Sequence, residues 1–173
     1  MKQAYKNMRA FWLDAKNLEN RKGVIEIGAD KIVAAGVEMA VSDGEEVKYV
    51  LVATNSLGDS SFYFENNSKS GLGGFVGGHG NEALQQAAAR MLAHASKLTA
   101  QMTLADGQLL PAPEQGGQVV IFALSKEKLF FTQVDESLVR NPENPFYPVF
   151  AYSQQVIGHF SRQGMSQKPQ GNA

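Results

Sequence analysis

Hydrophobic residues recur every three or four positions across residues 3–20, which is the period of an amphipathic α-helix. The apolar positions of this segment are Ala4, Tyr5, Met8, Phe11, Trp12, Ala15 and Leu18. Gly23 is a suitable place for such a helix to stop. The pattern therefore predicts a first helix with one apolar face available for packing.

From residue 24 to residue 64 the apolar period changes to two, which is typical of strands with one buried face. The alternation predicts four strands, near Ile25 and Ile27, over 33–41, over 47–53, and near Phe62 and Phe64. Between the second and third of these, Asp43 and Gly44 are expected to supply the positive φ angles of a tight turn. Successive strands in this segment should therefore pair antiparallel.

The second half of the chain predicts two further helices and one further hairpin. We expect a helix over 81–102 capped by Asn81, strands over 119–124 and 129–134, and a final helix over 148–162. The run 119–124 is continuously apolar, as in a strand buried on both faces. Prolines and glycines predict an irregular connection over 103–117, and the polar residues 164–173 predict a disordered tail.

The order helix, four strands, helix, two strands, helix predicts an α+β fold. We expect a mainly antiparallel sheet of about five or six strands with three helices packed on it, all within one domain over residues 1–163. The element order over residues 3–163 resembles that of two kinds of small module. One is the secretion chaperone, a dimer with helices around a strongly bent antiparallel sheet. The other is the roadblock or profilin-like module, with helices on an antiparallel sheet.

Charge is divided unevenly along the chain. The first 22 residues carry six basic and two acidic side chains, whereas residues 23–65 carry eight acidic and two basic ones. We expect the basic first helix to dock on the chain's own acidic strands. The alternative is that it meets an acidic partner or an anionic membrane surface.

Composition narrows the function classes. The chain has 173 residues and a net charge of −1, which argues against a dedicated nucleic-acid binder. It has no cysteine, which excludes thiolate metal sites and fits a cytoplasmic location, and no apolar run approaches the ~20 residues of a membrane span. The three histidines lack metal-like spacing, and no serine-nucleophile motif occurs. We therefore expect no metal and no cofactor, and catalysis is not favoured.

The segment from Gly71 to Gly80 stands out, because six of its ten residues are glycine. We expect a loop over 66–80, followed at once by a helix N-terminus with its partial positive charge. One hypothesis is therefore an anion or small-ligand site, possibly in an enzyme. Its residues would be Lys69, Gly73, Gly74, Gly77, Gly78, His79 and Asn81. The alternative is a mobile surface connector.

The predicted helix 81–102 has a second face of small residues, nearly opposite its apolar core face. The small residues are Ala89, Ala93, Ser96 and Ala100. Such a face allows another helix to approach closely, either the chain's own last helix or one from a second copy. The alternative is that alanine is present only because it favours helix formation at solvent-exposed positions. Our leading hypothesis is therefore a non-enzymatic protein-interaction module, a homodimeric adaptor or chaperone-like domain that uses these four residues as its interface.

Overall fold

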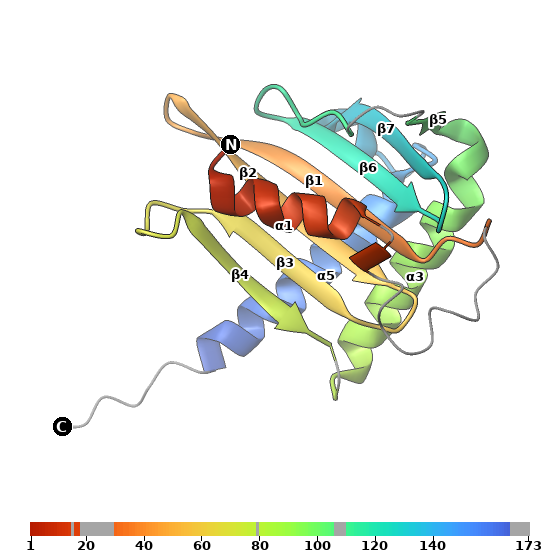
Figure 1. Ribbon diagram of the computed structural model, residues 1–173, viewed down its shortest axis with the longest axis horizontal. Coiled ribbons are helices and arrows are strands. Elements are labelled where there is room, and N and C mark those ends of the chain that lie inside the picture. The colour runs from red at the N-terminus through yellow and green to blue at the C-terminus, as the bar shows by residue number, and fades with distance from the viewer. Residues whose placement is uncertain (15, 18–29, 79, 106–109, 167–173) are drawn as a thin grey trace.

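The computed structural model describes residues 1–14, 16–17, 30–78, 80–105 and 110–166. Seven strands form one antiparallel sheet in the order β4-β3-β2-β1-β6-β7-β5. Helix α1 covers one face of this sheet, and helices α3 and α5 cover the other (Figure 1). The expected α+β class and the antiparallel sheet are therefore confirmed.

The bounds of the elements follow the chain order. The strands are β1 (Ala34–Asp43), β2 (Glu46–Asn55), β3 (Ser60–Glu65), β4 (Leu72–Gly77), β5 (Thr103–Leu104), β6 (Gln118–Leu124) and β7 (Leu129–Asp135). The helices are α1 (Gln3–Leu13), α3 (Glu82–Leu98), α4 (Glu136–Val139) and α5 (Tyr147–Ser166), with a 3-10 turn, η1 (Thr99–Gln101), after α3. No described helix is long and apolar enough to cross a membrane.

Several boundaries differ from those expected. Helix α1 ends at Leu13, and α5 continues to Ser166, so the first three residues of the expected tail, 164–166, are helical. The short strand β5 lies within the connection expected to be irregular. The strand expected at Ile25 and Ile27 lies outside the described residues.

The expected loop over 66–80 is wrong for its central part, because residues Leu72–Gly77 form strand β4 and pair with β3. Aromatic rings of β3 supply the packing that the glycines lack. A Cβ atom on Gly73 would come within 2.5 Å of the Phe64 ring, and one on Gly74 within 2.7 Å of the Tyr63 ring. Glycine is therefore required at these positions by the rings that lie over them.

The turn between β1 and β2 keeps only part of the expected pattern. Asp43 is the last residue of β1 and pairs with Glu46, so Gly44 and Glu45 form a two-residue turn. Gly44 has a φ of +65°, whereas no described residue other than glycine has a positive φ. Gly44 alone therefore supplies the left-handed conformation that we expected from both Asp43 and Gly44.

Both faces of the sheet are packed, so the central strands are buried on both sides. All residues from Val119 to Leu124 of β6 are buried, which confirms the expectation for this apolar run. On the face covered by α1, the Phe122 ring lies over Gly36, where a Cβ atom would come within 2.2 Å of it. Large residues on one strand thus fill the space left by small residues on the next.

Helix α1 docks on the chain's own sheet, as expected for its apolar face. Tyr5 and Trp12 are 0% and 1% exposed. Arg9 Nε donates to both carboxylate oxygens of Glu38, at 3.0 and 2.8 Å, and Tyr5 Oη donates to Glu38 Oε1 at 3.0 Å. Burial raises the pKa of Glu38 above its ordinary value, while Arg9 and Tyr5 act in the opposite direction. One basic residue of α1 therefore has an acidic counterpart inside the domain.

Candidate interaction site on helix α3

Helix α3 begins at the residue that the sequence predicted. Asn81 Oδ1 accepts a hydrogen bond from the Leu84 N–H group at 3.0 Å and so caps the helix. The helix buries one face against the sheet and α5, with the residues Leu84, Ala87, Ala88, Met91 and Ala95. The side chains available for a site are those on its remaining faces.

Helix α5 packs beside α3 and uses part of the polar face of that helix. The Tyr152 ring of α5 stacks on His94, with ring centroids 5.6 Å apart. The Arg90 guanidinium lies 5.8 Å from the centroid of the same ring, and its Nη1 donates to Tyr152 Oη at 3.4 Å. The chain's own last helix therefore contacts the side of α3 that carries Arg90 and His94, and not its row of small residues.

The row of small residues is exposed. Ala89, Ala93 and Ser96 lie on α3, and Ala100 lies in the turn η1 that follows it. All four are exposed to solvent. Nothing in the described part of the chain therefore buries the face that we expected to form an interface.

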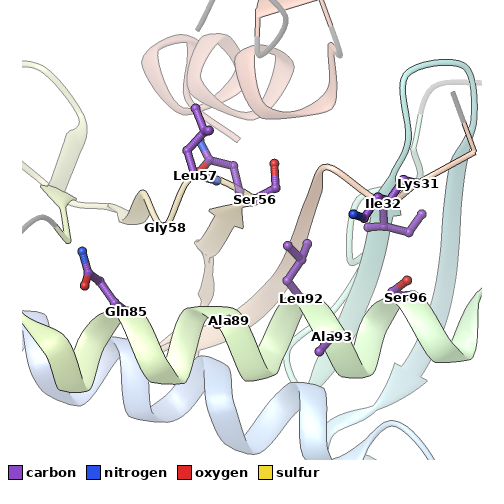
Figure 2. Close-up of a pocket in the computed structure, with 11 residues that line it drawn as sticks. Lys31, Ile32, Ser56, Leu57, Gly58, Gln85, Ala89, Leu92, Ala93 and Ser96 are labelled. Carbon is purple, nitrogen blue, oxygen red and sulfur yellow. Dashed lines mark hydrogen bonds between the residues drawn. The ribbon is translucent and has the colours of Figure 1, made fainter. Parts of the chain in front are cut away.

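A groove of about 510 Å³ is lined by three residues of this row, Ala89, Ala93 and Ser96 (Figure 2). Its α3 side is formed by Gln85, Ala89, Leu92, Ala93 and Ser96, and its other side by Lys31, Ile32, Asn55, Ser56, Leu57 and Gly58. Lys31 is the only charged residue among these. The groove is therefore mostly apolar along the helix and polar along the opposite turn.

The turn opposite α3 is held in a defined conformation. Asn55 Oδ1 accepts hydrogen bonds from the N–H groups of Leu57 at 3.0 Å and Asp59 at 3.1 Å. The Ser56 N–H group donates to the Val33 carbonyl at 2.9 Å, which ties the turn to the start of β1. This wall of the groove is therefore preformed. The sequence alone does not predict this wall, because no local pattern shows which helix a turn will face.

The residues expected to bind an anion are divided by strand β4. Lys69 lies in the turn before β4, and Gly73 and Gly74 lie within the strand. Gly77, Gly78 and Asn81 lie at its other end, where α3 begins (Figure 1). A strand of this length spans ~20 Å, so the structure does not bring Lys69 to Asn81. His79 lies outside the described residues.

The described residues contain no cluster of three His, Asp or Glu side chains that would suit a metal ion.

No protein-family model matches the chain, and no curated protein matches it.

Proposed function

We propose that the protein is a non-enzymatic protein-interaction module, a homodimeric adaptor or chaperone-like domain that dimerises through α3. The observation that carries this proposal is the exposed row of Ala89, Ala93, Ser96 and Ala100. Helix α5 contacts α3 through Tyr152, beside Arg90 and His94, and leaves this row free for a partner. The preformed groove beside the row adds room for side chains of a second copy.

The spacing of the row suits a second helix. Successive members are four, three and four residues apart, which is the alternation of a heptad seam. Small side chains allow two helix backbones to approach closely, and alanine loses almost no side-chain entropy when it is buried. A two-fold axis between Ala93 and Ser96 would place Ala93 opposite Ser96 and Ala89 opposite Ala100 of the second copy, as an isologous interface requires.

Sedimentation velocity over a wide range of protein concentration tests the proposal, with the variants Ala93→Glu and Gln86→Glu compared. Both substitutions add one negative charge at an exposed position of α3, but Gln86 does not line the groove. We expect Ala93→Glu to raise the dimer dissociation constant at least about tenfold, equivalent to ~1.4 kcal/mol, and Gln86→Glu to change it little. A wild-type protein that is monomeric at every concentration would contradict the proposal. Equal effects of the two variants would place the interface elsewhere.

A further inference from the structure

In the described part of the chain, β4 is an edge strand, and its own residues lack the usual features that prevent an edge strand from pairing. Edge strands generally carry charged residues or proline, contain a bulge, or are very short. Strand β5, at the opposite edge of the sheet, has only two residues. Strand β4 has six residues, none of them charged or proline, and it pairs with β3 without interruption from Leu72 to Gly77. Its Val76 is 69% exposed.

The hydrogen bonds at the start of β4 show which of its main-chain groups face outward. The Asn66 N–H group donates to the Gly71 carbonyl at 3.2 Å, so these two residues form a hydrogen-bonded pair. Such pairs alternate along an antiparallel ladder, so Gly73, Phe75 and Gly77 direct their main-chain groups toward β3. The N–H and C=O groups of Leu72, Gly74 and Val76 therefore point away from the sheet.

The outward N–H and C=O groups of these three residues can pair with the same groups of a second β4. When β4 runs antiparallel to a copy of itself about an axis at Gly74, the two Gly74 residues lie opposite each other and Leu72 lies opposite Val76. All outward N–H and C=O groups of Leu72, Gly74 and Val76 then find partners. This register brings no charged residues together and covers the exposed Val76 with an apolar side chain.

The α5 side of β4 is compatible with the same register. The Phe75 ring stacks between Phe62, at 6.2 Å, and Phe160 of α5, at 5.9 Å. Phe160 therefore lies on the side of Phe75 where a side chain of an added strand would project. In the register centred on Gly74, the residue opposite Phe75 is Gly73 of the second copy, which has no side chain to displace Phe160. Helix α5 crosses behind β4 and continues past the edge of the sheet (Figure 1), so an added strand would rest on it.

We propose that β4 is a second self-association surface, at which a second copy of this chain adds its own β4 in antiparallel orientation, centred on Gly74. The proposal rests on the proposed function in one respect, because it gives the self-associating module another interface. Two different two-fold interfaces, one at α3 and one at β4, link copies into assemblies larger than a dimer.

The first test compares Val76→Pro with Val76→Ala by sedimentation velocity, each alone and combined with Ala93→Glu. Proline removes the outward N–H group of residue 76 and leaves the β3–β4 hydrogen bonds intact, whereas alanine keeps that group. We expect the wild type to form assemblies larger than dimers at high concentration, Val76→Pro to stop at dimers, and Val76→Ala to behave as the wild type. The double variant Val76→Pro, Ala93→Glu should be monomeric.

The two proposals fail in different ways. If Val76→Pro matches the wild type while Ala93→Glu abolishes association, the β4 surface is wrong and the α3 interface stands. If Ala93→Glu leaves association unchanged while Val76→Pro abolishes it, the α3 interface is wrong and the β4 surface stands. Circular dichroism melting checks that each variant folds. If the proline variant does not fold, Val76→Lys replaces it, because this exposed position accepts a charge in the monomer.

Cross-linking tests the register directly, because the chain has no cysteine of its own. A mixture of the Leu72→Cys and Val76→Cys variants should be joined into mixed dimers by a bis-maleimide of ~8 Å reach, because opposite residues lie ~5.5 Å apart. The Val76→Cys variant alone should not react with itself, because its two thiols lie four residues apart along the strands, ~13 Å. Equal cross-linking of Val76→Cys alone and of the mixture would overturn the proposed register.

Discussion

The substitution Arg9→Met should show how much the buried ion pair beneath α1 contributes to folding. Methionine keeps much of the apolar stem of arginine but removes both Nε bonds to Glu38. It also removes the two bonds of 2.8 Å from Arg9 Nη2 to the Leu110 and Pro111 carbonyls. Among the described residues, Glu38, which is 0% exposed, would keep only the Tyr5 hydroxyl as a hydrogen-bond partner.

One magnitude gives the loss expected at pH 7, and a second limits its electrostatic part. Removing one partner of a buried ion pair destabilises a protein by about 3–5 kcal/mol. Alternatively, Glu38 can take up a proton on folding, which from an ordinary pKa of ~4.3 costs about 3.7 kcal/mol at pH 7. Because protonation limits the charge penalty, we expect Arg9→Met to lower the free energy of unfolding by about 3–4 kcal/mol. For a chain of this size the melting temperature would fall by roughly 6–16 °C.

The pH dependence gives the sharper test. Burial raises the pKa of Glu38, so the folded protein favours the neutral carboxyl, and this group's contribution to stability declines as the pH rises above its ordinary pKa. Arg9 moderates that decline, because its charge favours the ionised form. The difference between wild type and Arg9→Met should therefore be smaller near pH 4, where the loss of the two carbonyl hydrogen bonds remains, than near pH 7.

Urea unfolding can be followed at α1 itself, because Trp12 is the only tryptophan and is 1% exposed. Far-ultraviolet circular dichroism reports the rest of the fold in the same samples. Adding Glu38→Gln to Arg9→Met should restore most of the loss, because it removes the unpaired charge. A loss below ~1 kcal/mol at pH 7, or one that is equal at pH 4 and pH 7, would refute the reasoning.

Three further predictions concern single features of the fold. Gly36→Ala should destabilise the protein by about 1–3 kcal/mol in urea unfolding, because its Cβ atom would meet the Phe122 ring, and Phe122→Leu should relieve part of that loss. Asn81→Ala should cost ~1 kcal/mol through loss of the α3 cap, without altering the mass measured by light scattering. Phosphate and pyrophosphate should leave the melting temperature unchanged, because Lys69 and Asn81 lie at opposite ends of β4; a clear shift would support an anion site there.

The sequence predicts the fold class well wherever local periodicity carries the information. The alternation over 33–41 and 47–53 corresponds to β1 and β2, and the helical pattern after Asn81 corresponds to α3. The buried role of Glu38 was missed for a physical reason. Because side chains alternate along β1, Glu38 lies on the face of the strand opposite to that of Val37 and Met39. The face that carries Glu38 is buried only because α1 docks on it.

Strand β4 was missed because its stability comes from other parts of the chain. Glycine has a low strand propensity, so Gly73 and Gly74 predict a loop when they are considered alone. Their packing is supplied by Phe64 and Tyr63 of β3. The same limit applies to the groove, since α3 could be predicted from its own residues but the facing turn over 55–58 could not.

Inside this fold, small residues pack against large side chains on neighbouring strands. This packing distinguishes the buried surfaces from the exposed ones. The Phe122 ring fills the space over Gly36, and the Phe64 ring fills the space over Gly73. The exposed Ala93 on α3 has no such counterpart in the described chain, and the outer edge of β4 has no strand beside it there. If water is their final environment, Ala93→Glu and Val76→Pro will both be silent in sedimentation. If a second copy supplies the missing neighbour, each substitution will remove one contact and leave the other, because α3 and the edge of β4 are separate surfaces of the domain.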